Sequence, residues 1–66
     1  MNKAKFNITQ VVYLRTDPEL LPRIVTRYTV SHGSITYELS LGSSTSWHYE
    51  FEIVSNKDEL SKPIGF

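Results

Sequence analysis

The sequence contains no cysteine, carries no net charge and has no long apolar run, and each absence excludes a class of protein. Without cysteine, the chain has neither a disulfide nor a thiolate metal site to stabilise it. Seven basic residues balance seven acidic ones, so the basic surplus typical of nucleic-acid binders is missing. No apolar stretch approaches the roughly 20 residues that span a bilayer, and no apolar signal segment follows the N-terminus. We therefore expect a cytoplasmic location and no membrane partner.

With 66 residues, the chain has the size of a single domain. A domain this small is stabilised by only about 3–5 kcal/mol, so its apolar side chains must fill one core or be buried against a second copy. We expect an ordered part at 6–54, followed by a turn and a tail at 55–66. No cofactor is expected, because the three scattered glycines form no phosphate-binding loop.

Alternation of apolar and polar residues predicts short strands separated by turns. Strands are expected at 9–15, 24–31, 34–41 and from Trp47 onward, with loops at 16–22 and 42–46. His32-Gly33 indicates a tight hairpin turn, because glycine readily adopts positive φ. No stretch is long enough for a stable helix. We therefore predict an all-β fold of about five antiparallel strands, curled into a small barrel that buries one face and hides its edges.

The N-terminal stretch "FNITQVVYL" resembles the opening of the SH3-like barrels, particularly the small KOW and tudor kinds. Those barrels begin with an aromatic residue, a Gly-Asp turn and Val-x-Leu, to which Phe6, Val12 and Leu14 correspond. Thr9 and Gln10 stand where the Gly-Asp turn would be. The stretch "YLRTDPE" also resembles small SH3-like proteins of gut anaerobes and mobile elements. The resemblance implies one SH3-like barrel and assigns no activity.

Later stretches extend this resemblance over most of the chain. "RIVTRY" supplies the Ile-Val start of a strand, with Arg27 at a position where glycine is common. Tyr37 and Leu39 match a Tyr-x-Leu strand, and "WHYEFEI" is again similar to the gut-anaerobe proteins. Its "YEFEI" resembles the turn that precedes the last strand of these folds. The resemblance therefore implies that the fourth strand breaks near Glu50, with 51–53 in a turn.

The stretch "SWHYEFEIV" at 46–54 alternates aromatic and polar side chains. Its polar members His48, Glu50 and Glu52 would share one face of a flat strand, with successive side chains about 7 Å apart. Such a spacing would suit a metal ion. We prefer the simpler interpretation of a polar face in solvent opposite an apolar one, because a one-sided sheet requires this alternation. We predict no metal ligand and no catalytic residue.

Aromatic side chains are numerous for so small a core: four tyrosines, three phenylalanines and one tryptophan. Rings left at the surface beside an arginine form the kind of groove in which small barrels bind peptides, methylated side chains or bases. The candidate groove residues are Tyr13, Tyr28, Trp47, Tyr49 and Arg27. The competing interpretation places these rings in the core or in a homodimer contact. The sequence leaves open whether Trp47 is a core or a surface residue.

We therefore predict a small binding module for a protein or peptide partner, or for a second copy of itself. Two other classes stay open. A nucleic-acid-binding module of the KOW or tudor kind would use a basic strip at Arg15, Arg23 and Arg27, against which the neutral net charge argues. An enzyme would need a site at an oligomer axis, as in the type II dihydrofolate reductases, which are SH3-like barrels of this size. Their Val-Gln-Ile-Tyr pore motif is absent here, and we predict no enzyme.

Overall fold

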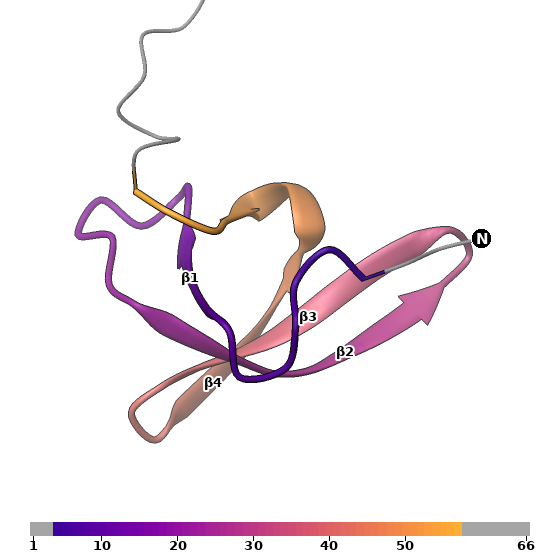
Figure 1. The fold of residues 1–66 in the computed structure, drawn as a ribbon, viewed down its shortest axis with the longest axis horizontal. Coiled ribbons are helices and arrows are strands. Elements are labelled where there is room, and N and C mark those ends of the chain that lie inside the picture. Colours follow the sequence, from indigo (N-terminus) through magenta and orange to yellow (C-terminus); the bar gives the residue numbers. More distant parts are fainter. Residues whose placement is uncertain (1–3, 58–66) are drawn as a thin grey trace, which may run out of the picture.

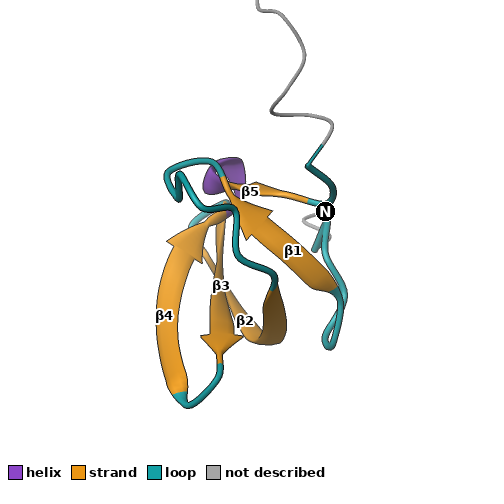
Figure 2. Ribbon diagram, turned by 90° about the vertical axis from the view of Figure 1, so that its left-hand side faces the viewer, coloured by secondary structure: helices purple, strands orange, loops and turns teal. Residues whose placement is uncertain are grey.

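The computed structural model describes residues 4–57, which form one antiparallel sheet of five strands. The elements are β1 (Val11–Leu14), β2 (Arg23–Ser31), β3 (Ser34–Leu41), β4 (Ser44–Tyr49), the 3-10 turn η1 (Glu50–Glu52) and β5 (Ile53–Val54). Their order across the sheet is β4-β3-β2-β1-β5. The sheet is bent, with the long β2–β3 hairpin projecting to one side (Figure 1) and β1 and β5 inclined steeply to β3 and β4 (Figure 2). The predicted all-β fold of five antiparallel strands is confirmed.

Two-residue turns join the three long strands. His32 and Gly33 have positive φ values of 49° and 79°, which define a type I′ turn between β2 and β3. Gly42, with φ of 64°, stands at the first central position of the turn between β3 and β4, as a type II′ turn requires. The predicted turn at His32-Gly33 is therefore confirmed. The fourth strand starts at Ser44, however, inside the segment 42–46 that was predicted as a loop.

A bulge in β2 decides which of its side chains face the core. Val25 pairs with Leu39 and Arg27 pairs with Glu38, so Thr26 is an extra residue between the two pairs. Successive cross-strand pairs lie on opposite faces of a sheet. Val25 therefore points to the core and Arg27 to the outer face. A regular strand would have put both residues on the same face.

The core lies on the concave side of the bent sheet and draws on β1, β2, β3, β5 and the segment before β1. Its members are Phe6, Val12, Leu14, Val25, Ile35, Tyr37, Leu39 and Ile53. The Tyr37 ring is fully buried, and Phe6 meets it edge-on with 5.3 Å between ring centroids. Val12 and Leu14 of β1 both point into this core. β4 contributes no buried residue, so it flanks the core without filling it.

The predicted strand at 9–15 is shorter than expected. Thr9 has a positive φ of 76° and belongs to a turn. Its N–H donates to the carbonyl of Val25 at 2.7 Å, which fixes the start of β1 beside β2. The predicted break near Glu50 is present as η1. Most of the predicted tail at 55–66 lies outside the described residues.

Within residues 4–57, no helix has the length and apolar character needed to cross a membrane.

Candidate functional site

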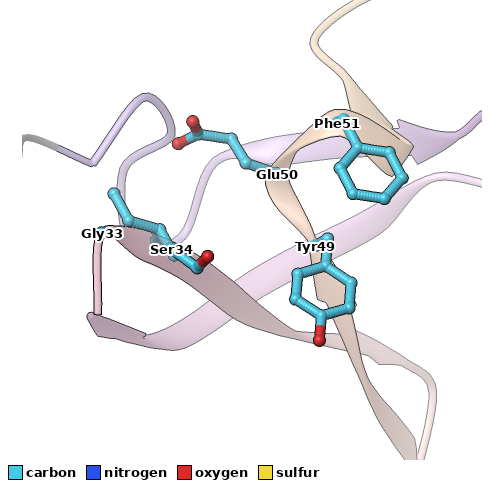
Figure 3. A pocket seen from close by; sticks show the side chains of 6 residues that line it. Gly33, Ser34, Tyr49, Glu50 and Phe51 are labelled. Carbon is cyan, nitrogen blue, oxygen red and sulfur yellow. The ribbon is translucent and has the colours of Figure 1, made fainter. Parts of the chain in front are cut away.

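Exposed aromatic side chains gather where β4 passes into η1. Trp47 is 47% exposed, Tyr49 51% and Phe51 74%. The Tyr49 and Phe51 rings stack, with centroids 5.6 Å apart and planes inclined by only 6° (Figure 3). Trp47 pairs with Glu38 and so lies on the outer face of the sheet, as Arg27 does. We call Arg27, Trp47, Tyr49 and Phe51 the aromatic face.

One cross-strand row places a cation beside Trp47. Glu38 of β3 pairs with Arg27 of β2 on one side and with Trp47 of β4 on the other. The Nε of Arg27 donates to Glu38 Oε1 at 2.8 Å, and the guanidinium carbon lies 5.9 Å from the centroid of the indole. Exposed cation–π contacts of this kind contribute about 0.5–1 kcal/mol. The row therefore holds the arginine over the ring.

Glu38, the central residue of this row, is a buried carboxylate with only 8% of the residue exposed. Hydrogen bonds from Arg27, and then from the Thr26 hydroxyl at 2.8 Å, hold the pKa of Glu38 below its ordinary value. The same contact with Glu38 raises the pKa of Arg27. Both groups are therefore charged at neutral pH, and the charge of Arg27 is compensated from beneath the aromatic face.

The prediction that His48 lies on a polar, solvent-facing side of its strand is wrong, because β4 turns this side toward the inner face of the sheet. His48 pairs with the buried Tyr37 and shares its inner face, whereas Trp47 pairs with Glu38 on the outer face. The His48 side chain is accordingly 17% exposed, against 47% for Trp47. Side chains of β1, β2, β3 and β5 fill the core, so the aromatic rings of β4, at the edge of the sheet, stay outside it.

The side chains of His48 and Glu52 support the turn from β4 into η1. The Nε2 of His48 lies 2.6 Å from the Ser46 hydroxyl, and its Nδ1 lies 3.5 Å from Glu52 Oε1. The same carboxylate oxygen accepts the N–H of Tyr49 at 2.9 Å. Within residues 4–57, no three side chains of ligand type come together as a metal site would need. These contacts form a local brace for the chain reversal.

Glu50 belongs to a separate polar cluster, which sequence reasoning missed. The buried hydroxyl of Tyr37 donates to Glu50 Oε2 and accepts the N–H of Lys5 at 2.8 Å and that of Phe6 at 3.4 Å. Burial, and next the bond to Glu50, raises the pKa of Tyr37 above its ordinary value. The hydroxyl therefore stays protonated and ties the N-terminal segment to β3 and η1. The one available signal was a tyrosine on the inner face of a strand, since a buried hydroxyl needs a partner.

A shallow open pocket of about 300 Å³ adjoins the stacked rings. It is lined by Gly33, Ser34, Ile35, Tyr49, Glu50 and Phe51. Figure 3 shows the Glu50 side chain directed away from the two rings. Its carboxylate is already bonded to Tyr37, so the pocket offers mainly ring surface and the backbone of the β2–β3 turn. Its volume is at the lower end of the roughly 300–1,000 Å³ of ligand sites.

Three members of the predicted groove lie on one face of the sheet: Arg27 lies over Trp47, and Tyr49, two residues further along β4, stacks on Phe51. Phe51 was outside the predicted groove, because its position follows from η1 and from the stacking on Tyr49. Trp47, whose place the sequence left open, is a half-exposed surface residue.

Tyr28 and Tyr13 lie elsewhere, so the predicted five-residue groove does not form as one site. Tyr28 pairs with Tyr37 on the inner face, and their ring centroids are 5.9 Å apart. Tyr13 is in β1, which β2 and β3 separate from β4, and the Nζ of Lys57 lies 5.4 Å from its ring centroid.

The three arginines considered for a basic strip have different local partners. Arg23 forms an ion pair with Asp17 at 3.2 Å, and Arg27 one with Glu38 at 2.8 Å. The Nε of Arg15 donates to a backbone carbonyl of η1 at 3.0 Å. Two of the three positive charges are therefore neutralised by carboxylates.

Comparison of the chain with protein-family models, curated proteins and solved structures gives no match.

Proposed function

We propose that this protein is a small interaction module of the SH3-like barrel kind, and that its aromatic face binds a protein or peptide partner. The observation that carries the proposal is the exposure of Trp47, Tyr49 and Phe51 on one surface beside Arg27. Aromatic residues and arginine are enriched in protein interfaces and dominate their binding energy. The largest apolar patch on the surface of a monomer is often the one that binds a partner.

The barrel assignment has local support in two places. Thr9 takes a positive φ where these barrels have a glycine turn, and η1 precedes the last strand as the resemblance implies. The bent sheet, whose strands β1, β2, β3 and β5 share one core, fits the same assignment.

The size of the aromatic face favours a peptide-sized contact. Taking about 150–250 Å² for each whole side chain, the three rings expose roughly 300–400 Å². A stable protein interface buries about 800 Å² on each partner. The aromatic face therefore supplies the centre of an interface, to which an extended peptide with apolar side chains would bind.

Nucleic acid is the weaker alternative. Single strands also stack their bases on aromatic rings, but they need cations along the path of the phosphates. The aromatic face includes one cation, Arg27, whose charge is paired with Glu38. The aromatic face therefore has no row of positive charges for the phosphate contacts that supply most of the affinity for nucleic acid.

The test is a screen of an arrayed peptide library with the labelled protein, followed by calorimetric titration of the peptide that binds best. Trp47→Ala and Phe51→Ser should each weaken binding by about tenfold or more, the effect of losing an interface anchor. Tyr28→Ser is the matched control, since it removes an exposed ring from the opposite face and should change the affinity less than about twofold.

The reverse pattern, in which Tyr28→Ser abolishes binding and Phe51→Ser does not, would place the site on the inner face and refute the proposal. Binding of a thymidine oligonucleotide that salt abolishes, with no peptide bound in the screen, would favour the nucleic-acid alternative instead.

A further inference from the structure

β4 is an edge of the sheet, with β3 on one side and no other strand of residues 4–57 on the other. The two-residue turn at Gly42 determines which backbone groups face outward. Residues that flank such a turn exchange both hydrogen bonds, so Ser44 bonds to β3 and every second residue after it does the same. The N–H and C=O groups of the alternate residues Thr45, Trp47 and Tyr49 therefore point away from β3.

One of these outward groups is already occupied. The N–H of Tyr49 donates to the carboxylate of Glu52, which closes the end of the edge next to η1. No group of residues 4–57 bonds to the outward N–H and C=O groups of Thr45 and Trp47, which form the open part of the edge. The opposite edge of the sheet, β5, is only two residues long.

β4 itself has no charged residue, no proline and no bulge, which are devices that often protect an exposed edge. Its sequence, Ser44 to Tyr49, contains no lysine, proline, aspartate or glutamate. Its pairing with β3 runs without a register shift, so no bulge distorts it. Such an uncharged, regular edge is a template for another strand.

We propose that β4 pairs with the β4 of a second copy of this chain, antiparallel and across a two-fold axis between the two Ser46 residues. In this register Thr45 of each copy lies opposite Trp47 of the other. The two N–H and two C=O groups left open on each copy then all find partners. Glu52 keeps the N–H of Tyr49, so the pairing ends where the structure closes the edge.

A second copy fits this edge better than an unrelated strand would. The open groups on each copy belong only to Thr45 and Trp47, so in the symmetric register those of one copy meet those of the other and none is left over on either strand. No charged side chain of β4 opposes its own image across the axis. The two Trp47 rings become diagonal neighbours, about 7–8 Å apart and within contact range of large side chains. A contact between two six-residue strands buries less than the roughly 1,200 Å² of stable interfaces, so the dimer should dissociate on dilution.

The pairing would also join the two aromatic faces. Both Trp47 rings lie on the outer face, so the dimer presents one continuous surface with two copies of the peptide site. This last step rests on the proposed function, whereas the pairing of β4 does not.

The absence of cysteine makes a cross-linking test clean. In the proposed register the two Ser46 residues form a non-hydrogen-bonded pair with about 4.5 Å between Cα atoms, within the roughly 4.4–6.8 Å range of disulfides. Mild oxidation of Ser46→Cys should therefore yield mainly disulfide-linked dimer. Ser43→Cys, an exposed thiol in the turn of the same hairpin, is the control and should stay largely monomeric.

Light scattering at a series of concentrations gives the second readout. The wild-type protein should pass from monomer to dimer as its concentration rises. Thr45→Pro, which removes an outward N–H that β3 does not use, should remain monomeric with an unchanged circular dichroism spectrum. If Thr45→Pro fails to fold, the comparison of the two cysteine variants decides the question by itself.

A wild-type protein that stays monomeric at about 1 mM, far above physiological concentrations of most proteins, would overturn the proposal, since contacts of this size have weak but measurable affinity. A dimer in which Ser46→Cys cross-links no faster than Ser43→Cys would overturn it too, because the axis would lie elsewhere. Peptide titration separates this inference from the proposed function. Failure of dimerisation with retained peptide binding refutes only the pairing, and cross-linking without any peptide binding refutes only the proposed function.

Discussion

The substitution Tyr37→Phe removes a single oxygen atom from the core, and we expect it to lower the free energy of unfolding by about 2–4 kcal/mol. The hydroxyl donates to Glu50 and accepts the backbone N–H groups of Lys5 and Phe6. The ring is fully buried, and the edge-on contact with Phe6 does not involve the oxygen. Phenylalanine preserves the packing, so the measured change reports the hydroxyl.

The magnitude follows from the partners that the hydroxyl leaves behind. A hydrogen bond to a charged group contributes about 1.5–3 kcal/mol, and a buried N–H left unpaired, as that of Phe6 would be, costs about 1–3 kcal/mol. The N–H of Lys5 keeps the Glu50 carboxylate at 3.2 Å, so it adds little. Because the two contributions overlap, we expect less than their sum. A domain of this size has about 3–5 kcal/mol of stability, so the variant should retain only about 1 kcal/mol, which leaves roughly one molecule in six unfolded at 25 °C.

Urea unfolding at 25 °C measures this, with the fluorescence of Trp47, the one tryptophan of the chain, as the signal. Tyr28→Phe is the control at an exposed ring and should change the stability by less than about 0.5 kcal/mol. A double-mutant cycle with Glu50→Gln should give a coupling energy above about 1 kcal/mol. A Tyr37→Phe protein as stable as the wild type, within about 0.5 kcal/mol, would refute the reasoning.

Three further predictions concern the surface and the turns. Trp47→Ala should cost only about 1–2 kcal/mol, against about 3–5 for a core tryptophan, because half of the residue is already exposed; urea unfolding followed by circular dichroism checks this. Gly42→Ala should cost about 1–2 kcal/mol, since its φ of 64° disfavours a side chain, while Ser43→Ala in the same turn should cost almost nothing; equal losses in urea unfolding would contradict this. The folded state lowers the pKa values of Glu38 and Asp17. The stability they contribute is therefore complete above their unfolded-state pKa values and is lost as the pH falls through the folded-state ones, so the melting temperature should drop below about pH 4. Glu38→Gln should reduce that drop, and an unchanged pH profile would argue against the ion pair with Arg27.

Local signals in the sequence predict a strand well where its alternation and the residues of the adjacent turn indicate the same boundary. β3 occupies the predicted 34–41, because clean alternation follows a turn that needs glycine at position 33. The break at Glu50 was also predictable, but only through the resemblance to SH3-like barrels. β1 came out shorter than predicted, since Thr9 takes a left-handed conformation that threonine rarely adopts.

Which face of a strand is buried cannot be predicted from the alternation of apolar and polar residues alone. Alternation shows that Trp47 and His48 point to opposite faces, but the core side is decided by Tyr37 and Glu38 across the strand pair. A buried carboxylate such as Glu38 has no signature in the sequence, because its partners Arg27 and Thr26 come from another strand.

The candidate groove failed as one site for a related reason. Its members were chosen by residue type, and the strand order then separated Tyr13 from Trp47, while pairing put Tyr28 on the inner face. The presence of a cluster of exposed rings was therefore predictable, but its membership depended on contacts between distant parts of the chain.

The extra residue Thr26 shifts the alternation of inward-facing and outward-facing side chains between the two halves of β2. Removing Thr26 would make the pairs of Val25 and Arg27 consecutive, so both halves of β2 would keep their present faces, whereas a regular strand that retained Thr26 would force one half to exchange its faces. If the half after the bulge turned, Tyr28 would reach the outer face and Arg27 would be carried inward, away from Trp47. A point substitution of Thr26 leaves this alternation of side-chain directions unchanged. Whether a cation accompanies the indole thus depends on the sheet accommodating Thr26 as a bulge, and not on the residue types of β2 alone.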